Sequence, residues 1–376
     1  MTENSETDQG MAENGRIDNP MEEQHRRRVH YKGTHPHTYE EKYKELNPEK
    51  YPETVRKVIE KGSTPAGMHI PIAVNEILDV LRIRPGESGV DCTLGYGGHT
   101  RKLLGALGYP ENGSGHLTAL DIDRENLART GKMLREEGFD ENALTVMYLN
   151  FAELDRAAEE RGPFDFLLAD LGVSSMQIDD PARGFSFKRE GPLDLRLDQS
   201  KGETAAERLR GMERDEIEGM LTENADEPYA AEIAKAITEA YRKKQKIETT
   251  TDLAAIVEGA VAEAIKGQEG LKKADIAELQ KKSCTRTFQA LRIDVNHEYE
   301  SLYSLLEKIP KVLAPGGRAA ILTFHSGEDR MVKKVFKEQK KQGLYSEISE
   351  DVVRPTEEEC RRNPRARSAK LRWAVK

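Results

Sequence analysis

The stretch VDCTLGYGGHT, residues 90–100, combines an acid with a glycine-rich turn of a kind that can hold a small ligand against the backbone. Glycine has no Cβ and tolerates positive φ, so a ligand can approach such a loop closely. Gly95, Gly97 and Gly98 are not followed by the Lys-Ser/Thr of a phosphate-binding P-loop, and the third glycine of a dinucleotide-binding GxGxxG is missing. The loop alone predicts either a nucleotide-type ligand or only a tight turn.

Two acids that end apolar runs narrow the choice of ligand. Asp121 closes the second run and Asp170 closes the fourth. Asp121 can accept hydrogen bonds from both hydroxyls of a ribose. The alternative is that Asp121 caps the N-terminus of the helix that follows. A ribose suits a nicotinamide dinucleotide, which also needs a pyrophosphate site, or S-adenosylmethionine, whose amino-acid tail needs room. Asp170 would then face the reaction centre.

The elements that must position these residues begin at Met68, where short apolar runs alternate with helix-length polar segments. Such alternation predicts a parallel sheet with crossover helices, an α/β Rossmann-like fold. A helix is expected over residues 73–83. Strands are expected over residues 89–94, 117–123, 144–150, 164–171, 314–324 and 369–376.

The alternation stops near residue 200, where helical spacing takes over. Helices are expected over residues 207–221, 228–244 and 250–265, and Thr249 to Thr251 offer N-caps for the last. The sequence therefore divides into four parts. They are an N-terminal extension (1–67), disordered in its first 24 residues, the first part of the α/β domain (68–199), a helical insertion (200–283) and the second part of the α/β domain (284–376).

Composition excludes several classes of protein. The 376 residues are 37% hydrophobic, enough for a sizeable core, and no run of about 18 apolar residues predicts a membrane span. Cys92, Cys284 and Cys360 are isolated, which argues against a zinc site or a disulfide framework and fits a reducing cytoplasm. We find no cluster of metal ligands in the sequence. The oligomeric state stays open, a homodimer included.

Local basic segments carry the case for RNA, since the formal net charge of −9 argues against a protein coated with nucleic acid. Residues 25–37 form a basic, histidine-rich arm, with a solvated tail as the alternative. Residues 330–341 form a basic helix, and residues 361–376 contain seven basic side chains and no acid. These segments could contact phosphates, although the last of them also suits a plain edge strand.

Five sequence blocks occur in a fixed order that is specific for one protein family. Together they resemble the ribosomal RNA small subunit methyltransferase H family, the MraW-like methylases, from about Met68 to the C-terminus. The blocks are DCTLGYGGHT (91–100), DLGVSSMQIDDPARGFSFKREGPLDLRLD (170–198), TRTFQALRIDVNHE (285–298), APGGRAAILTFHSGEDRMVKK (314–334) and NPRARSAKLR (363–372).

The resemblance implies a class I S-adenosylmethionine-dependent methyltransferase with an inserted helical substrate-recognition domain. It also implies methylation at N4 of a cytidine in 16S rRNA, in the decoding centre of the small ribosomal subunit, with a related methyltransferase acting on another RNA cytidine or on a non-RNA substrate as the alternative. Met176 replaces the family's usual proline, Gly327 its usual leucine, and SCT (283–285) its usual PAT. The 67-residue extension is absent from the common form of the family.

Residue by residue, the resemblance gives the site. The residues expected to hold S-adenosylmethionine are Gly97, Gly98, His99, Asp121, Phe151, Asp170 and Gln177. Asp170 is also the candidate catalytic residue, because a carboxylate there could orient the cytosine amine and accept its proton after transfer, unless it only holds the cofactor.

Four residues are candidates for contact with the RNA. Phe185 and Phe187 lie two apart and could stack on a flipped base, with packing of a lid as the alternative. Arg183 lies in the same loop. His325 follows the expected fifth strand and could donate to RNA or cofactor, with a satisfied structural histidine as the alternative.

Overall fold

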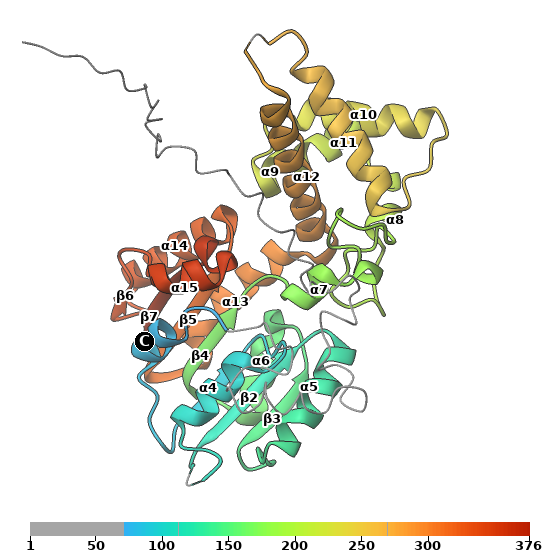
Figure 1. Cartoon of the computed structure of the whole chain (residues 1–376). Coiled ribbons are helices and arrows are strands. Elements are labelled where there is room, and N and C mark those ends of the chain that lie inside the picture. The colour runs from blue at the N-terminus through green and yellow to red at the C-terminus, as the bar shows by residue number, and fades with distance from the viewer. Residues whose placement is uncertain (1–70, 112, 269) are drawn as a thin grey trace, which may run out of the picture.

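The computed structural model describes residues 71–111, 113–268 and 270–376, and a seven-stranded sheet forms its centre (Figure 1). The strand order is β3-β2-β1-β4-β5-β7-β6; β1 to β5 run parallel, and β7 runs antiparallel to both of its neighbours. The strands are β1 (Ser88–Asp91), β2 (His116–Asp121), β3 (Leu144–Tyr148), β4 (Phe164–Asp170), β5 (Leu313–Thr323), β6 (Glu347–Ile348) and β7 (Lys370–Val375). The expected α/β, Rossmann-like class is thereby confirmed.

Helices cover both faces of this sheet, and each face has its own apolar core. One core joins the sheet to α3 (Val74–Leu81), α4 (Gly98–Ala106) and α5 (Arg124–Glu136). The other joins it to α6 (Leu154–Arg161), α13 (Glu298–Val312) and α14 (Ser326–Lys341). Central strands buried on both sides need near-continuous apolar sequence, which is why β4 consists largely of Phe, Leu and Ala.

The C-terminal strand departs from its expected place. β7 is not an edge strand, because the short β6 pairs with its outer side. Arg372 on β7 is 4% exposed and forms an ion pair with Asp329 at 2.6 Å, and Lys370 contacts the same carboxylate. These two cations are therefore used inside the fold.

A second unit, built from five helices, stands above the carboxyl ends of the strands (Figure 1). Its helices are α8 (Ala205–Gly211), α9 (Arg214–Ala225), α10 (Ala230–Arg242), α11 (Thr250–Ala264) and α12 (Lys273–Asn296). Thr249 caps α11 as expected, since its side chain accepts from the backbone N–H of Asp252. The helix expected over 207–221 is instead two helices, because Glu213 starts a new capping box with Glu216.

The helix α12 passes through the boundary expected at 283/284 and ends only at Asn296. There the Asn296 side chain accepts from the backbone N–H of Leu197 and donates to the carbonyl of Leu195. The end of α12 thus holds the loop that enters the helical unit. Shorter elements complete the fold: η2 (Phe151–Glu153), α7 (Ser175–Asp179), η3 (Pro181–Arg183), α15 (Glu357–Arg362) and η4 (Pro364–Ser368).

No helix in the described part of the chain is long and apolar enough to cross a membrane. The expected extension, with its acidic start and the basic arm at 25–37, lies outside the described residues.

Candidate active site

A cavity of about 630 Å³ opens between the two units, at the carboxyl ends of the parallel strands. Its walls are the glycine loop after β1, the ends of β2 and β4, the segments after β3 and β5, the loop at 185–197 and one face of α12. Open α/β sheets bind ligands in this place, because strands whose crossovers leave to opposite faces open a crevice there.

Gly95 brings the loop to the cavity. It lines the wall, adopts φ +50°, and donates its backbone N–H to Oδ2 of Asp121 at 2.9 Å. Its carbonyl accepts from Asn126 and Thr130 of α5. A Cβ at Gly95 would have only the Thr93 carbonyl nearby, at 3.8 Å. The loop is therefore tied to Asp121 through Gly95, a residue that was not among the expected cofactor contacts.

The structure gives Gly97 a role in the backbone turn, and its expected contact with S-adenosylmethionine stays a prediction. Gly97 is the N-cap of α4 at φ 74°, a conformation that favours glycine, and it is not among the residues that line the cavity. A Cβ there would point into the protein, 3.0 Å from Arg101 and 3.1 Å from Thr130. Gly98, the next residue, does line the cavity.

Asp121 ends β2 on the cavity wall, with Oδ1 accepting from the backbone N–H of Asp123 and Oδ2 from Gly95. Burial raises the pKa of Asp121 to about 6. The N-cap of α5 is Asp123, whose side chain accepts from Asn126, so the alternative that Asp121 caps this helix is wrong. A partly buried carboxylate with remaining acceptor capacity fits the hydroxyl pair of a ribose.

Asp170 ends β4 on the same wall, and its two carboxylate oxygens differ. Oδ2 lies 3.2 Å from Nδ1 of His99, whereas Oδ1 is buried without a hydrogen-bond partner. Its backbone N–H donates to the Thr93 hydroxyl at 2.8 Å. A buried carboxylate oxygen without a donor is costly, and such an atom beside a cavity indicates that a ligand supplies the donor.

Phe151 and Gln177 also border the cavity, as the resemblance requires of cofactor contacts. Phe151 opens η2, directly after β3. Gln177 completes the capping box of α7 with Ser174, and its amide donates to Oδ2 of Asp123 at 3.2 Å. The roles of both residues in binding the donor stay predictions.

The structure turns Arg183 away from the cavity. Its guanidinium forms an ion pair with Asp123 at 2.7 Å and donates to the carbonyl of Leu197 at 2.7 Å. A buried guanidinium with these partners holds the loop against α5. The expected contact of Arg183 with RNA therefore has no geometric support.

Phe185 and Phe187 border the cavity but pack mainly into the helical unit. Phe185 is 9% exposed, and the Phe187 ring lies 5.4 Å from that of Phe288 on α12. This is the packing alternative that the sequence left open. Stacking of either ring on a base stays a prediction.

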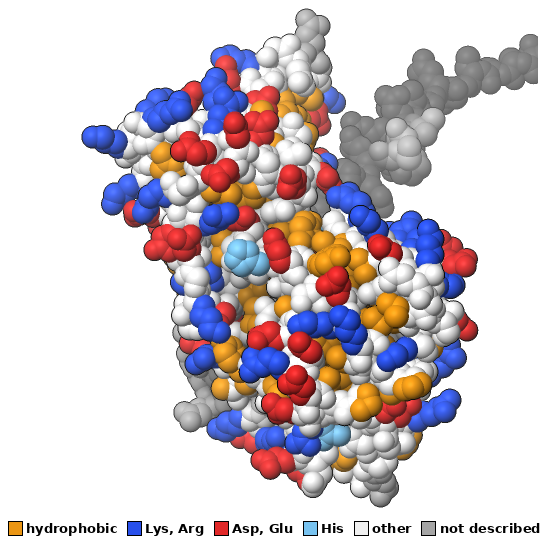
Figure 2. Space-filling view, turned by 180° about the vertical axis from the view of Figure 1, so that it is seen from behind, with side chains coloured by type: hydrophobic (Ala, Val, Ile, Leu, Met, Phe, Trp, Pro, Cys, Tyr) orange, Lys and Arg blue, Asp and Glu red, His pale blue; other side chains and the backbone are white. Residues whose placement is uncertain are grey.

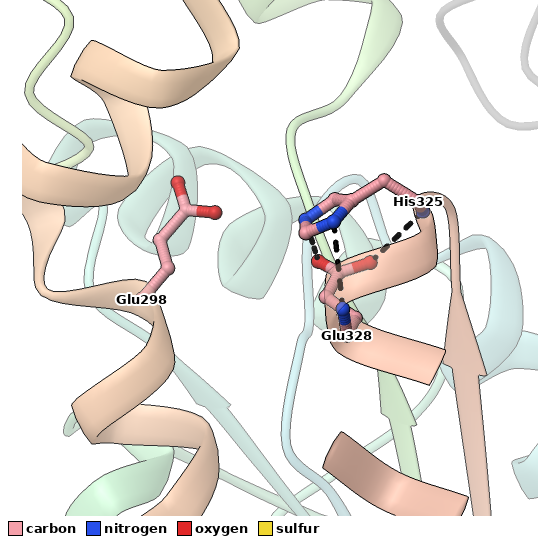
Figure 3. Close-up of side chains that lie close together, drawn as sticks. All are labelled: Glu298, His325 and Glu328. Atoms are coloured by element: carbon pink, nitrogen blue, oxygen red, sulfur yellow. Dashed lines mark hydrogen bonds and ion pairs between the residues drawn. The ribbon is translucent and has the colours of Figure 1, made fainter. Parts of the chain in front are cut away.

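The cavity wall on the α14 side has a polar cluster of His325, Glu328 and Glu298, which come from two sequence regions (Figure 3). Possible metal-ligand atoms of the three lie within 4.8 Å of one another, although the sequence gave no sign of such a cluster.

Each of the three residues is already used by the protein. His325 and Glu328 form the capping box of α14 and an ion pair at 3.1 Å, and Glu298 binds Arg292 through both of its oxygens. Burial acts to raise the pKa of Glu328, but the His325 hydrogen bond and charge lower it overall. The structural alternative for His325 thus accounts for its contacts, and we assign no metal to the cluster.

The sequence reasoning did not assign the contribution of α12. Lys281, Thr285, Phe288 and Arg292 form one stripe along the cavity wall, with Gln289 beside them. Their spacing of three and four residues is the signal that could have identified a common helix face.

A seven-stranded sheet with this order, a glycine loop after β1 and a partly buried acid at the end of β2 define a class I S-adenosylmethionine-dependent methyltransferase. The profile of the MraW methylase family matches residues 66–376, and the chain belongs to this family. The resemblance seen in the five sequence blocks is thereby confirmed.

Curated relatives agree with this assignment. Ribosomal RNA small subunit methyltransferase H 1 of Lachnoclostridium phytofermentans is 56% identical over 98% of this chain and 99% of its own length, so the match includes most of the N-terminal extension. The protein of the same name from Agathobacter rectalis is 57% identical over 94% of this chain and 99% of its own length. An rRNA methylase structure from Streptococcus thermophilus aligns with a TM-score of 0.36 and 13% identity, covering 81% of this chain and 93% of that one.

S-adenosylmethionine is the methyl donor of the family, and the cavity suits it. Asp121 offers carboxylate oxygens to ribose hydroxyls, and Gly95 and Gly98 leave the loop backbone accessible. Phe151 adds an apolar wall, and Asp170 lines the cavity with one buried carboxylate oxygen that has no partner. These residues fit the donor, while the contacts of each one with it stay predictions.

Proposed function

We propose that this chain transfers a methyl group from S-adenosylmethionine to N4 of a cytidine in 16S rRNA, in the decoding centre of the small ribosomal subunit. The names of the curated relatives support rRNA as the substrate. The buried, unpaired Oδ1 of Asp170 at the cavity wall carries the proposal for the chemistry, because an amine that must be held and later deprotonated needs such an acceptor.

The chain has two tasks in this reaction. S-adenosylmethionine supplies an electrophilic methyl group, but the cytosine amine is a weak nucleophile because its lone pair is delocalised into the ring. Asp170 Oδ1 can accept one amine N–H and so turn the lone pair toward the methyl group. After transfer the nitrogen is positively charged and acidic, and the same oxygen can take its proton. A carboxylate of ordinary basicity could not deprotonate the neutral amine first.

The acceptor base must leave its stack to enter the cavity. Phe187 and Phe288 offer apolar surface beside it, and Lys188, Lys281 and Arg365 bring positive charge to its lining from three different elements. These cations can neutralise phosphates of the flanking nucleotides.

The face of the molecule seen in Figure 2 mixes both signs of charge. Lys370 and Arg372 of the basic C-terminal segment are used inside the fold, whereas Arg361, Arg365 and Arg367 are exposed. Such a surface favours an enzyme that reads one shaped RNA site over one that binds any RNA. In this proposal the helical unit is the substrate-recognition domain, and the protein acts in the cytoplasm on the small subunit.

The test is labelled methyl transfer to small subunits from cells that lack this protein, followed by mass spectrometry of the rRNA nucleosides and mapping of the modified position. We expect N4-methylated cytidine at one site in 16S rRNA. Asp170→Asn should lose most of this activity. Asp165→Asn, a change of the same kind at the start of β4 where the carboxylate accepts from the Ser88 N–H, should retain it.

A methyl group on another nucleotide, or on protein, would contradict the proposed substrate. Unchanged turnover in Asp170→Asn would remove Asp170 from the chemistry.

A further inference from the structure

His99, on the first turn of α4, is buried between the segment that precedes α3 and the end of β4. Its Nε2 lies 2.9 Å from the carbonyl oxygen of Ile72, and its Nδ1 lies 3.2 Å from Oδ2 of Asp170. A carbonyl and an ionised carboxylate only accept hydrogen bonds, so both ring nitrogens must carry a proton to satisfy them. The two distances fit a positively charged imidazolium between two acceptors.

The surrounding charges agree with this protonation state. Asp170 on β4 contacts the ring, the fully buried Asp91 on β1 faces it, and Glu359 of α15 binds the backbone of the segment that carries the Ile72 carbonyl. Burial alone would lower the pKa of His99. The charge and hydrogen bond of Asp170 outweigh burial, with help from Ile72 and Asp91, and raise the pKa to about 8.

The contact with His99 restricts the orientation of the Asp170 carboxylate. Its Oδ2 lies against His99 and its backbone N–H donates to Thr93, while Oδ1 is buried without a partner in a residue that lines the cavity. A carboxylate fixed at one oxygen presents the other in one direction only.

We propose that His99 is a positioning residue for methyl transfer, and that its doubly protonated ring fixes Asp170 through Oδ2 so that Oδ1 faces the acceptor amine. The inference rests on the role of Asp170 in the proposed function. The family resemblance counts His99 among the residues that hold the donor, but both of its ring nitrogens are used within the protein. Its side chain acts through Asp170, and loss of its proton should release that carboxylate.

The first test is independent of activity. Nitrogen-15 NMR of histidine-labelled protein, without donor or RNA, distinguishes imidazolium from neutral imidazole. We expect the His99 ring to be doubly protonated at pH 7 and to titrate with a midpoint near 8. Asp170→Asn should shift this midpoint downward, because the facing negative charge is removed. The His99 signals are assigned by their absence in His99→Gln.

The second test is the pH dependence of kcat at saturating donor and small subunits. The wild-type kcat should fall above a pH of about 8 as one proton is lost. Glutamine can donate to only one of the two acceptors, so His99→Gln should lower kcat at pH 7 about 10- to 100-fold. The alkaline decline that belongs to His99 should disappear in this variant, and donor affinity should change much less than kcat.

His116→Gln is the matched control. His116 is also bound at both nitrogens, but its partners are the Asn142 carbonyl and the Thr145 hydroxyl, which a neutral ring satisfies. This variant should keep both kcat and the alkaline decline.

A neutral His99 at pH 7 would overturn the inference, and so would an alkaline decline that persists in folded His99→Gln. If the wild type does not methylate small subunits, the proposed function is wrong. The NMR measurement still tests the protonation of His99, because it needs neither donor nor RNA.

Discussion

Gly327 lies so close to Tyr299 that an added Cβ there would be 1.9 Å from the hydroxyl oxygen of Tyr299 and 2.9 Å from its Cζ. Tyr299 donates to the carbonyl of Asn224 in the helical unit at 3.3 Å, and its ring lies 6.0 Å from that of His325. Gly327→Ala would therefore displace a side chain that connects α13 to the helical unit.

Two effects of opposite sign determine how much Gly327→Ala changes the free energy of unfolding. Overpacking of a fitted contact typically costs about 1–3 kcal/mol. Replacing a helical glycine by alanine gains up to about 1 kcal/mol, since the unfolded chain loses freedom. We expect Gly327→Ala to lower the free energy of unfolding by about 1–2 kcal/mol, because the overpacking term is the larger. In a Tyr299→Leu background the obstacle is gone, and the same change should stabilise the protein by about 0.5–1 kcal/mol.

The assay is urea unfolding of the four proteins of this double-mutant cycle, followed through the fluorescence of Trp373 on β7, the only tryptophan in the chain. Because α14 packs on β7, this signal reports the unit that contains Gly327. The expected coupling energy between positions 299 and 327 is about 2 kcal/mol. If Gly327→Ala stabilises the protein equally in both backgrounds, the close approach of Tyr299 is not what requires a glycine here.

Three further predictions concern the cavity and the glycine loop beside it. Donor affinity should fall about tenfold for each pH unit below 6, because Asp121, whose pKa burial raises to about 6, must be ionised to accept from ribose hydroxyls; calorimetry should show this slope in the wild type and none in Asp121→Asn. Gly97→Ala should lower the free energy of unfolding by about 1–3 kcal/mol in a thermal melt, since it forces a side chain into positive φ, and an unchanged melting temperature would contradict the packing described. Lys281→Ala and Arg365→Ala should each reduce the slope of log affinity for small subunits against log salt by roughly 0.7–0.9, whereas Lys132→Ala on α5 should leave it unchanged.

The sequence predicts the sheet and its acids well, because local patterns decide both. Apolar runs of strand length between helical segments leave few arrangements other than a parallel sheet, and the carboxyl ends of parallel strands meet at one edge. Asp121 and Asp170 could therefore be placed on one wall from their positions alone.

The remainder depends on contacts between distant parts of the chain. An arginine such as Arg183 is a typical RNA-contacting residue. Its partner Asp123 lies 60 positions away in the sequence, and no local pattern predicts that ion pair. At Gly97, an added Cβ would point toward Thr130 of α5 and not toward the cavity, because α5 packs behind the glycine loop. The cluster of Glu298, His325 and Glu328 forms only when α13 and α14 pack together.

The continuity of α12 has a consequence for how this enzyme can be divided or recombined. One face of this helix packs into the core of the helical unit, and another lines the cavity from Lys281 to Arg292; the helix ends where Asn296 holds the entry loop. A cut at 283/284 would split one 24-residue helix and expose Phe288 and Leu291, which are buried in the core of the helical unit. The insertion expected at residues 200–283 therefore cannot be exchanged as an independent segment. Grafting the helical unit of a relative should preserve the enzyme only when the graft carries the chain through Asn296, so changes in the helical unit and in the shape of the cavity are coupled through one helix.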